Sequence, residues 1–303
     1  MEENSVLVFG SVAYDCIETP FDKADYILGG SASYAALASS FFAPTKMVGV
    51  VGGDFKQDDI RRLSARGIDI RGLEIKSEGQ TFFWRGKYCN NFNERDTLEV
   101  RVNVYENYDP KIPEALRNCP FVLLGNIDPS VQAKVLDKME SPRFVILDTM
   151  NLWIEIANKP LRELIKRADI LILNDSEARQ LANENNLILC GDLLREMGAK
   201  SVIIKKGEHG AMLFHADGFF TLPAYPVRAL HDPTGAGDSF AGALAGYMAG
   251  AGSTDFETIK RAMLAGTAAA SITVESFSCY KLEESGLAEV EAREEHIRKI
   301  TAV

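Results

Sequence analysis

The sequence predicts a doubly wound α/β fold, with a mostly parallel sheet flanked by helices. Short apolar runs such as Val6–Phe9 have the length and composition of strands buried on both faces. Segments with helical periodicity, such as Ser31–Phe42, separate these runs. At 303 residues, with 46% hydrophobic and 25% charged residues, the chain can bury a large core.

The expected elements follow one another in this alternation. Apolar runs bounded by polar residues predict the strands Val6–Phe9, Met47–Val51, Phe121–Leu124, Phe144–Leu147, Ile170–Leu173 and Val202–Ile204. Helical patterns between them predict the helices Ser31–Phe42, Phe55–Ala65, Ser130–Met139, Ser176–Ala182 and Asp238–Ala249. Gly67 is placed to end the second helix. No repeat or low-complexity linker interrupts the pattern, so residues 1–303 are expected to form a single α/β domain.

Two segments depart from the alternation. Thr81–Tyr88 and Thr97–Val104 interleave β-branched and aromatic residues with polar ones, and Asn90–Arg95 joins them, which predicts a hairpin with one face in water. Val12–Ile27 follows the first strand and is expected to add one or two more strands. Together they suggest a small lid sheet, inserted as segments of about 12–28 and 79–105. An ordinary surface hairpin is the alternative.

Charge and composition exclude several classes of function. The formal net charge of −10 argues against a nucleic-acid partner, because phosphate backbones require clustered Lys and Arg. The five cysteines are dispersed without a Cys-x-x-Cys pair, as in a cytoplasmic protein with reduced thiols. The acidic start lacks the features of a signal peptide, and no apolar stretch reaches the roughly 18 residues of a membrane helix. We therefore expect a cytoplasmic protein without a membrane partner.

Residues 232–240, Asp-Pro-Thr-Gly-Ala-Gly-Asp-Ser-Phe, indicate where the chemistry lies. The small residues Gly235, Ala236 and Gly237 at a helix start let backbone N–H groups approach an anion, and the helix terminus adds partial positive charge. Asp238 follows directly, where a carboxylate can take a proton from an incoming hydroxyl. Such glycines and a first-turn Asp also occur as purely structural features. The complete string predicts a phosphoryl-transfer site with its base attached.

Polar residues follow several predicted strands. Ligands usually bind an open α/β sheet beyond the carboxyl ends of its strands. The residues found there are Asp15, Asp54, Asn126, Asp148 and Asn174. Each alone is a common turn or capping residue, and their convergence at one edge is what indicates a site.

The string at 232–240 resembles the second signature of the ribokinase-like (PfkB) carbohydrate kinase family, and the resemblance spans nearly the whole chain. The further matches, in the order and spacing of the family, are Gly10-Ser11 with Asp15, Gly29-Gly30, Val50-Val51-Gly52-Gly53-Asp54, Asn174-Asp175-Ser176-Glu177 and Lys205-Lys206-Gly207-Glu208-His209-Gly210. The resemblance implies a kinase that uses ATP and Mg²⁺ to phosphorylate a hydroxyl of a small sugar or sugar derivative.

The resemblance also implies roles for individual residues. Asp238 is the implied general base, and Gly235, Ala236 and Gly237 are the implied anion hole. The implied nucleotide-binding residues are Asn174, Glu177, Lys205, Gly207, Gly210 and Thr234, with Asn174 and Glu177 holding Mg²⁺ only through water. The implied substrate-binding residues are Asp15, Gly29, Gly30, Tyr34 and Asp54. For Asn174 and Glu177, a simple helix cap is the structural alternative.

Some positions depart from the family pattern. Many members have Asn four residues after the second glycine, where this chain has Tyr34, which suggests a bulkier or more apolar substrate than ribose. The stretch Val274–Ser278 lacks the Gly-Ala of potassium-activated members, which argues against a monovalent-cation site near Asp232. We expect His231, beside the motif, to be structural or solvent-facing.

The role of the lid aromatics and the class of acceptor each have alternatives. The lid aromatics Phe82, Trp84, Tyr88 and Phe92 either line the substrate pocket or fill the lid's own packing, and the resemblance allows a homodimer through the lid. A nucleoside kinase of the same fold is the first functional alternative. A non-catalytic sugar or nucleotide sensor is the second, and the intact Gly235, Gly237 and Asp238 disfavour it.

Overall fold

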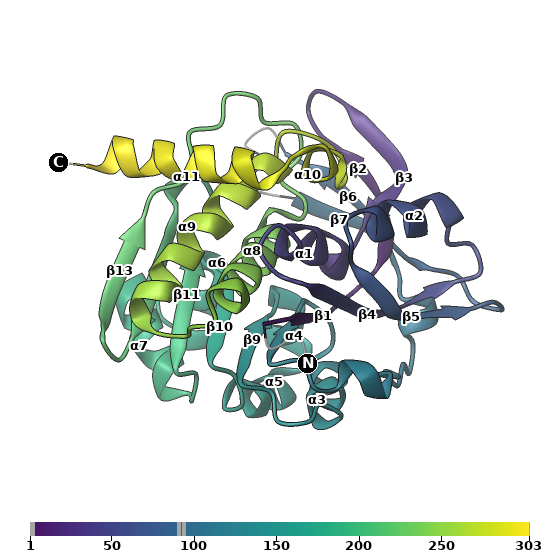
Figure 1. Cartoon of the computed structure of the whole chain (residues 1–303), viewed down its shortest axis with the longest axis horizontal. Coiled ribbons are helices and arrows are strands. Elements are labelled where there is room, and N and C mark those ends of the chain that lie inside the picture. The colour runs from purple at the N-terminus through teal and green to yellow at the C-terminus, as the bar shows by residue number, and fades with distance from the viewer. Residues whose placement is uncertain (1–3, 90–91, 93–94, 303) are drawn as a thin grey trace.

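The computed structural model describes residues 4–89, 92 and 95–302. Within these residues, a nine-stranded sheet runs through the molecule in the order β13-β12-β11-β10-β9-β8-β1-β4-β5 (Figure 1). Neighbouring strands from β5 to β11 pair in parallel, and β12 and β13 run antiparallel at one edge. The predicted doubly wound, mostly parallel sheet is confirmed.

The strands of this sheet are β1 Val6–Phe9, β4 Thr45–Gly52, β5 Asp69–Lys76, β8 Phe121–Leu124, β9 Phe144–Asp148, β10 Ile170–Asn174, β11 Ser201–Lys205, β12 Ala211–His215 and β13 Gly218–Leu222. The α-helices are α1 Ser31–Ser39, α2 Gln57–Ala65, α3 Pro129–Asp137, α4 Asn151–Ile156, α5 Asn158–Ile165, α6 Asp175–Ala182, α7 Leu187–Glu196, α8 Ala236–Ala251, α9 Phe256–Thr273, α10 Tyr280–Glu284 and α11 Leu287–Thr301. Short 3₁₀ turns lie at η1 Asn103–Tyr105, η2 Glu114–Leu116 and η3 Gly207–His209.

Central strands such as β1 and β8 are apolar throughout because helices cover both faces of the sheet. Val6 and Val8 of β1 pack into one core with α1, α8 and α9. Leu7 and Phe9, whose side chains alternate with them, pack into a second core with α3, α5, α6 and α7. Figure 1 shows α1, α8 and α9 together on one side of the sheet. No helix in the described part of the chain is long and apolar enough to cross a membrane.

Two predicted boundaries are wrong for identifiable reasons. The first helix ends at Ser39 instead of Phe42, because a tighter turn follows it: the Phe42 N–H donates to the Ser39 carbonyl over 3.0 Å. Pro44 comes next and disfavours a helical conformation for the residue before it. The second hairpin strand ends at Arg101, because the 3₁₀ turn η1 carries Val104 into the core.

The lid is a second, four-stranded sheet, in the order β3-β2-β6-β7. Its strands are β2 Ala13–Glu18, β3 Lys23–Gly29, β6 Phe82–Tyr88 and β7 Arg95–Arg101. Two antiparallel hairpins, β2–β3 and β6–β7, join through the parallel pair β2–β6. The prediction of a lid sheet from these two segments is confirmed, and the ordinary surface hairpin is wrong. Most of the joining stretch Asn90–Arg95 lies outside the described residues.

Candidate active site

The candidate site lies at the carboxyl ends of the parallel strands. Asp148, Asn174 and Lys205 are the last residues of the neighbouring strands β9, β10 and β11. The loop 232–235 leads into helix α8 beside them, and the lid covers this edge of the sheet. The predicted convergence therefore holds for Asp148 and Asn174. Asn126, after β8, accepts a hydrogen bond from the Trp153 indole N–H at 2.9 Å.

Helix α8 begins with a turn that requires glycine. Gly235 is its N-cap and has a φ of 79°, in the left-handed region that L side chains rarely adopt. A Cβ at this position would also overlap the Tyr34 ring. The Ala236 N–H donates to the Pro233 carbonyl at 3.2 Å. Of the three small residues, Gly235 and Gly237 are therefore the ones with amides available for an anion at the helix terminus.

Lys205 brings a positive charge to this turn. A Cβ on Gly237 would lie 2.8 Å from the Lys205 Nζ, so glycine is what lets the ammonium approach the helix start. The Nζ donates to Asp148 Oδ1 at 3.3 Å. Burial acts to lower the pKa of Lys205, but the carboxylates of Asp148, Glu177 and Asp238 raise it overall. The site thus holds a fixed cation beside the amides.

Four carboxyl groups of the site have raised pKa values. Burial, with the charge of Asp148, raises the pKa of Asp238 to about 7. Burial likewise raises the pKa of Glu177 to about 7 and that of Asp232 to about 6. Burial and the charges of Asp232 and Asp238 raise the pKa of Asp15 to about 8. Negative charge in the site is therefore incompletely balanced, a condition that favours a ligand carrying cations.

Asn174 and Glu177 form a capping box at the start of α6. The Glu177 N–H donates to Asn174 Oδ1 at 2.8 Å, and the Asn174 N–H donates to Glu177 Oε2 at 2.7 Å. In the described part of the chain, no group of three or more His, Cys, Asp or Glu side chains is arranged to hold a metal ion directly. Mg²⁺ keeps several waters and binds through few protein oxygens, so these residues fit it as holders of metal-bound water.

The predicted substrate residues separate into two groups. Asp15, on β2, is 4% exposed and packs so closely on Gly29 that a Cβ there would overlap its carboxylate. Gly30 follows with a φ of 89°. Tyr34 is buried beneath Gly235, and its hydroxyl has no hydrogen-bond partner among the described residues. This group lies next to Asp232 and Asp238.

Asp54 does not join this group. Its Oδ1 accepts hydrogen bonds from the Thr81 N–H and hydroxyl, both at 2.8 Å. With Tyr14 and Phe83 it lines a small cavity, and those side chains lie on the face of the lid sheet opposite Asp15. The structure therefore gives Asp54 a part in anchoring the lid strand β6.

Gly207 and Gly210 shape the turn after β11, directly beyond Lys205. Both have positive φ, 55° and 84°, and the Lys206 N–H donates to the Gly210 carbonyl at 2.7 Å. A Cβ on Gly210 would overlap the Leu222 carbonyl of the neighbouring chain segment. This turn fixes where β11 ends, and with it the Lys205 side chain.

The lid touches the anion-hole loop at one point. The hydroxyls of Tyr88 and Thr234 are 2.9 Å apart. Trp84 and Phe92 pack with Tyr88, Ile17 and Ile27 in a small apolar cluster that Phe277 joins from the other side. Phe82 instead meets Tyr105 edge-on, with ring centroids 6.0 Å apart, and packs on the main core. Of the four lid aromatics, three therefore pack in one cluster, which Tyr88 links to the loop 232–235.

Sequence reasoning missed Arg95, the first residue of β7. It pairs with Tyr88 across the hairpin and lies over the Trp84 ring, 5.4 Å from its centroid. Its positive charge interacts electrostatically with the carboxylates of Glu177 and Asp238. The sequence carries no signal for this, because only the hairpin register aligns Arg95 with Tyr88.

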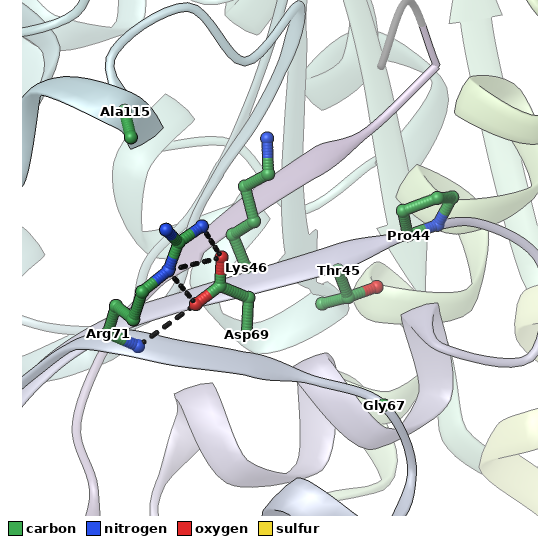
Figure 2. Close-up of a pocket in the computed structure, with 7 residues that line it drawn as sticks. All are labelled: Pro44, Thr45, Lys46, Gly67, Asp69, Arg71 and Ala115. Atoms are coloured by element: carbon green, nitrogen blue, oxygen red, sulfur yellow. Dashed lines mark hydrogen bonds and ion pairs between the residues drawn. The ribbon is translucent and has the colours of Figure 1, made fainter. Parts of the chain in front are cut away.

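A cavity of about 360 Å³ lies far from these residues (Figure 2). It is lined by Pro44, Thr45, Lys46, Gly67, Asp69, Arg71 and Ala115. Figure 2 shows Arg71 and Asp69 joined by several hydrogen bonds. Since Thr45 and Asp69 begin β4 and β5, this cavity lies at the amino ends of the strands, opposite the candidate site.

Comparisons with known proteins identify the family and the fold. The profile described as pfkB family carbohydrate kinase matches residues 3–285. A cytidine kinase of Thermococcus kodakarensis is 29% identical over 252 residues, covering 81% of this chain and 89% of that protein. The crystal structure of the Methanocaldococcus jannaschii nucleoside kinase has the same fold, with a TM-score of 0.78 at 21% identity over 97% of this chain and 99% of that one. An E. coli protein assigned as a ribokinase II and crystallised with ATP and Mg²⁺ matches with a TM-score of 0.79, at the same identity and coverage.

Proposed function

Since the chain belongs to the pfkB family of carbohydrate kinases, and is therefore a phosphotransferase with a hydroxyl acceptor, we propose that it transfers the γ-phosphoryl group of ATP to a sugar hydroxyl of a nucleoside. One observation carries the proposal: Asp238 lies in the first turn of α8, beside the Gly237 amide and the Lys205 ammonium. A base, an anion hole and a cation thus meet at one point. ATP is supported as the donor by the E. coli structure crystallised with ATP and Mg²⁺.

The residues present account for each part of the transfer. Asp15 holds acceptor hydroxyls at the lid side of the site. The acceptor oxygen attacks the γ-phosphorus, the bond from that phosphorus to the bridging oxygen breaks to release ADP, and the hydroxyl proton passes to the Asp238 carboxylate. The Gly235 and Gly237 amides and the Lys205 ammonium stabilise the charge on the transferring group.

Magnesium bound to ATP offsets the phosphate charge. Asn174 and Glu177 would hold it through water, as the capping box leaves Glu177 Oε1 free of any described hydrogen bond. Burial raises the pKa of Glu177 to about 7, and a bound cation would favour its ionised form.

The lid favours a nucleoside over a free sugar. Trp84, Tyr88 and Phe92 offer flat apolar surface on the side of the lid that carries Asp15. A nucleobase stacks on such surface, whereas a monosaccharide presents mainly hydroxyls. Two of the compared proteins are named for cytidine and nucleoside substrates. A free sugar or sugar derivative, held by Asp15 alone, is the second candidate.

The test is ADP release with Mg-ATP across nucleosides, free sugars, sugar acids and polyols. We expect nucleoside-dependent release by the wild type and none by Asp238→Asn. Release with free sugars alone would replace the nucleoside by the second candidate. Release that persists in the variant would remove Asp238 from the mechanism.

We also propose a homodimer formed through the lid. Tyr26, Leu98 and Val100 of the lid are 49%, 55% and 48% exposed, an unusual amount of apolar surface for a solvated sheet. Light scattering after size exclusion should give twice the chain mass, and Leu98→Glu should return the monomer. A wild-type monomer at all concentrations would exclude this contact.

A further inference from the structure

Arg95 is positioned by the lid to face the phosphoryl-transfer site. In the register of the lid sheet, Asp15 pairs with Trp84 and Tyr88 pairs with Arg95, so these side chains share one face. On that face, the Tyr88 hydroxyl meets the Thr234 hydroxyl at 2.9 Å. Gly235, the N-cap of α8, directly follows Thr234 in the sequence. The hairpin register therefore brings Arg95 to the start of α8.

In the described part of the chain, the neighbour that acts most strongly on Arg95 is the Tyr88 hydroxyl, and no ion pair holds its charge. Within the described residues, no carboxylate oxygen lies within 4.0 Å of its guanidinium, whereas Lys205 already binds Asp148. Glu177 and Asp238 are the carboxylates that act on Arg95 most strongly. The residue is exposed, so an incoming phosphate group can reach it.

A purely structural role explains less of this arrangement. Stacking on Trp84 would hold the guanidinium against the lid, and such a contact is worth roughly 0.5–1 kcal/mol at an exposed site. Stacking alone does not require the cation to interact with the carboxylates of Glu177 and Asp238. Arg101 shows the contrast: on the same strand it lies over Phe83 and pairs with Glu99 on the opposite face of the lid.

Extending the proposed function, we propose that Arg95 is a catalytic residue that donates hydrogen bonds to the γ-phosphoryl group of ATP during transfer. The γ-phosphorus must lie near the base Asp238 at the start of α8, and the lid register brings Arg95 toward that point through Tyr88 and Thr234. A guanidinium presents a planar fork of donors that matches two phosphate oxygens at once. Lys205 and Arg95 then hold the transferring group from the core and from the lid.

The first experiment compares nucleotide affinities by calorimetry in the presence of Mg²⁺. Arg95→Gln should weaken binding of the β,γ-imido analogue of ATP about tenfold, as expected for a lost charge-assisted hydrogen bond, and leave ADP binding unchanged. Arg101→Gln is the matched control on the same strand and should change neither affinity. Equal weakening of both nucleotides, or no change in either, would overturn the proposal. This measurement needs no acceptor, so a wrong acceptor class does not affect it.

The second experiment uses the acceptor found in the substrate panel. Arg95→Gln should lower kcat about 100-fold or more and leave the KM for the acceptor nearly unchanged, with Arg95→Lys between the two. Guanidinium chloride should restore part of the activity of Arg95→Ala, and sodium chloride at equal ionic strength should not. A raised acceptor KM at unchanged kcat would assign Arg95 to acceptor binding and refute its contact with the phosphoryl group. Unfolding temperatures within about 2 °C of the wild type are expected throughout, since surface substitutions change stability little.

Discussion

Substituting Gly235 by alanine tests the turn on which the anion hole depends. Two costs add. A Cβ in the left-handed conformation costs roughly 1–2 kcal/mol, and φ at Gly235 is 79°. The Cβ also overlaps the buried Tyr34 ring, and overpacking of this kind costs roughly 1–3 kcal/mol. The sum, about 2–5 kcal/mol, corresponds to a fall of about 4–10 °C in the unfolding temperature of a chain of this size.

Gly67 provides a matched control. Its φ is 73°, but a Cβ there would meet nothing within 4 Å. Gly67→Ala therefore carries the backbone cost without the overlap, and its unfolding temperature should fall by only about 2–4 °C. Calorimetric scans of both variants separate the two costs. In kinetic assays Gly235→Ala should also lose about 100- to 1,000-fold in kcat, because the amides of the turn move, and Gly67→Ala should not.

Equal unfolding temperatures for the two variants would show that the Tyr34 ring does not confine the turn. Near-normal kcat in Gly235→Ala would show that the anion hole does not need this conformation. In the double variant Gly235→Ala, Tyr34→Ala, the overlap is absent, so the two substitutions should cost about 1 kcal/mol less together than their sum.

Three further predictions follow from the charges and the lid contact. Because burial raises the pKa of Asp238 to about 7 and the base must be ionised, kcat/KM should rise with pH through about 7; a flat profile from pH 5.5 to 8 would contradict this. Because the folded-state pKa values of Asp15 and Glu177 are raised, to about 8 and about 7, their contribution to stability is present at pH 4 and is lost as pH rises to 8. The unfolding temperature of the ligand-free protein should therefore fall over that range, and it should fall less in Asp15→Asn. An identical pH dependence in the two proteins would show that Asp15 does not contribute to it. Finally, Tyr88→Phe removes the contact with Thr234 and should raise the KM for the acceptor about fivefold, in line with roughly 1 kcal/mol for one hydrogen bond; an unchanged KM would mean that the contact does not hold the lid.

The sequence was most informative where a strand is buried on both faces. Val6–Phe9 and Phe121–Leu124 have continuous apolar runs, and their predicted bounds match β1 and β8. The edge strand β5 is Asp-Ile-Arg-Gly-Leu-Glu-Ile-Lys, and its charged residues hide the strand pattern. The hairpin β12–β13 was also missed, although its partner β11 was predicted. β5 and β13 lie at the edges of the sheet and are partly exposed, so their composition resembles that of loops. β12 is a buried inner strand, and its apolar run is not explained in this way.

Candidate residues come together in space where they are close in sequence or end neighbouring strands. Asp148, Asn174 and Lys205 meet because parallel strands end at a common edge. Tyr34 was assigned to the substrate, but the structure buries it under Gly235, a contact between helices that no local pattern specifies. Two residues depend on the lid. Hydrogen bonds from Thr81 hold Asp54 away from the site, and the hairpin register brings Arg95 toward it.

In the proposed transfer, the location of Asp15 on β2 divides the two reactants between two sheets. The residue that holds the acceptor belongs to the lid, whereas Lys205 and Glu177, which serve the donor, and the base Asp238 belong to the central sheet and its helices. Movement of the lid would then itself bring the attacking oxygen toward the phosphorus. The segments joining the sheets, such as Gly10–Val12 and Ser77–Thr81, set the distance between the reacting atoms, and a change in their length would tune the rate without touching either ligand.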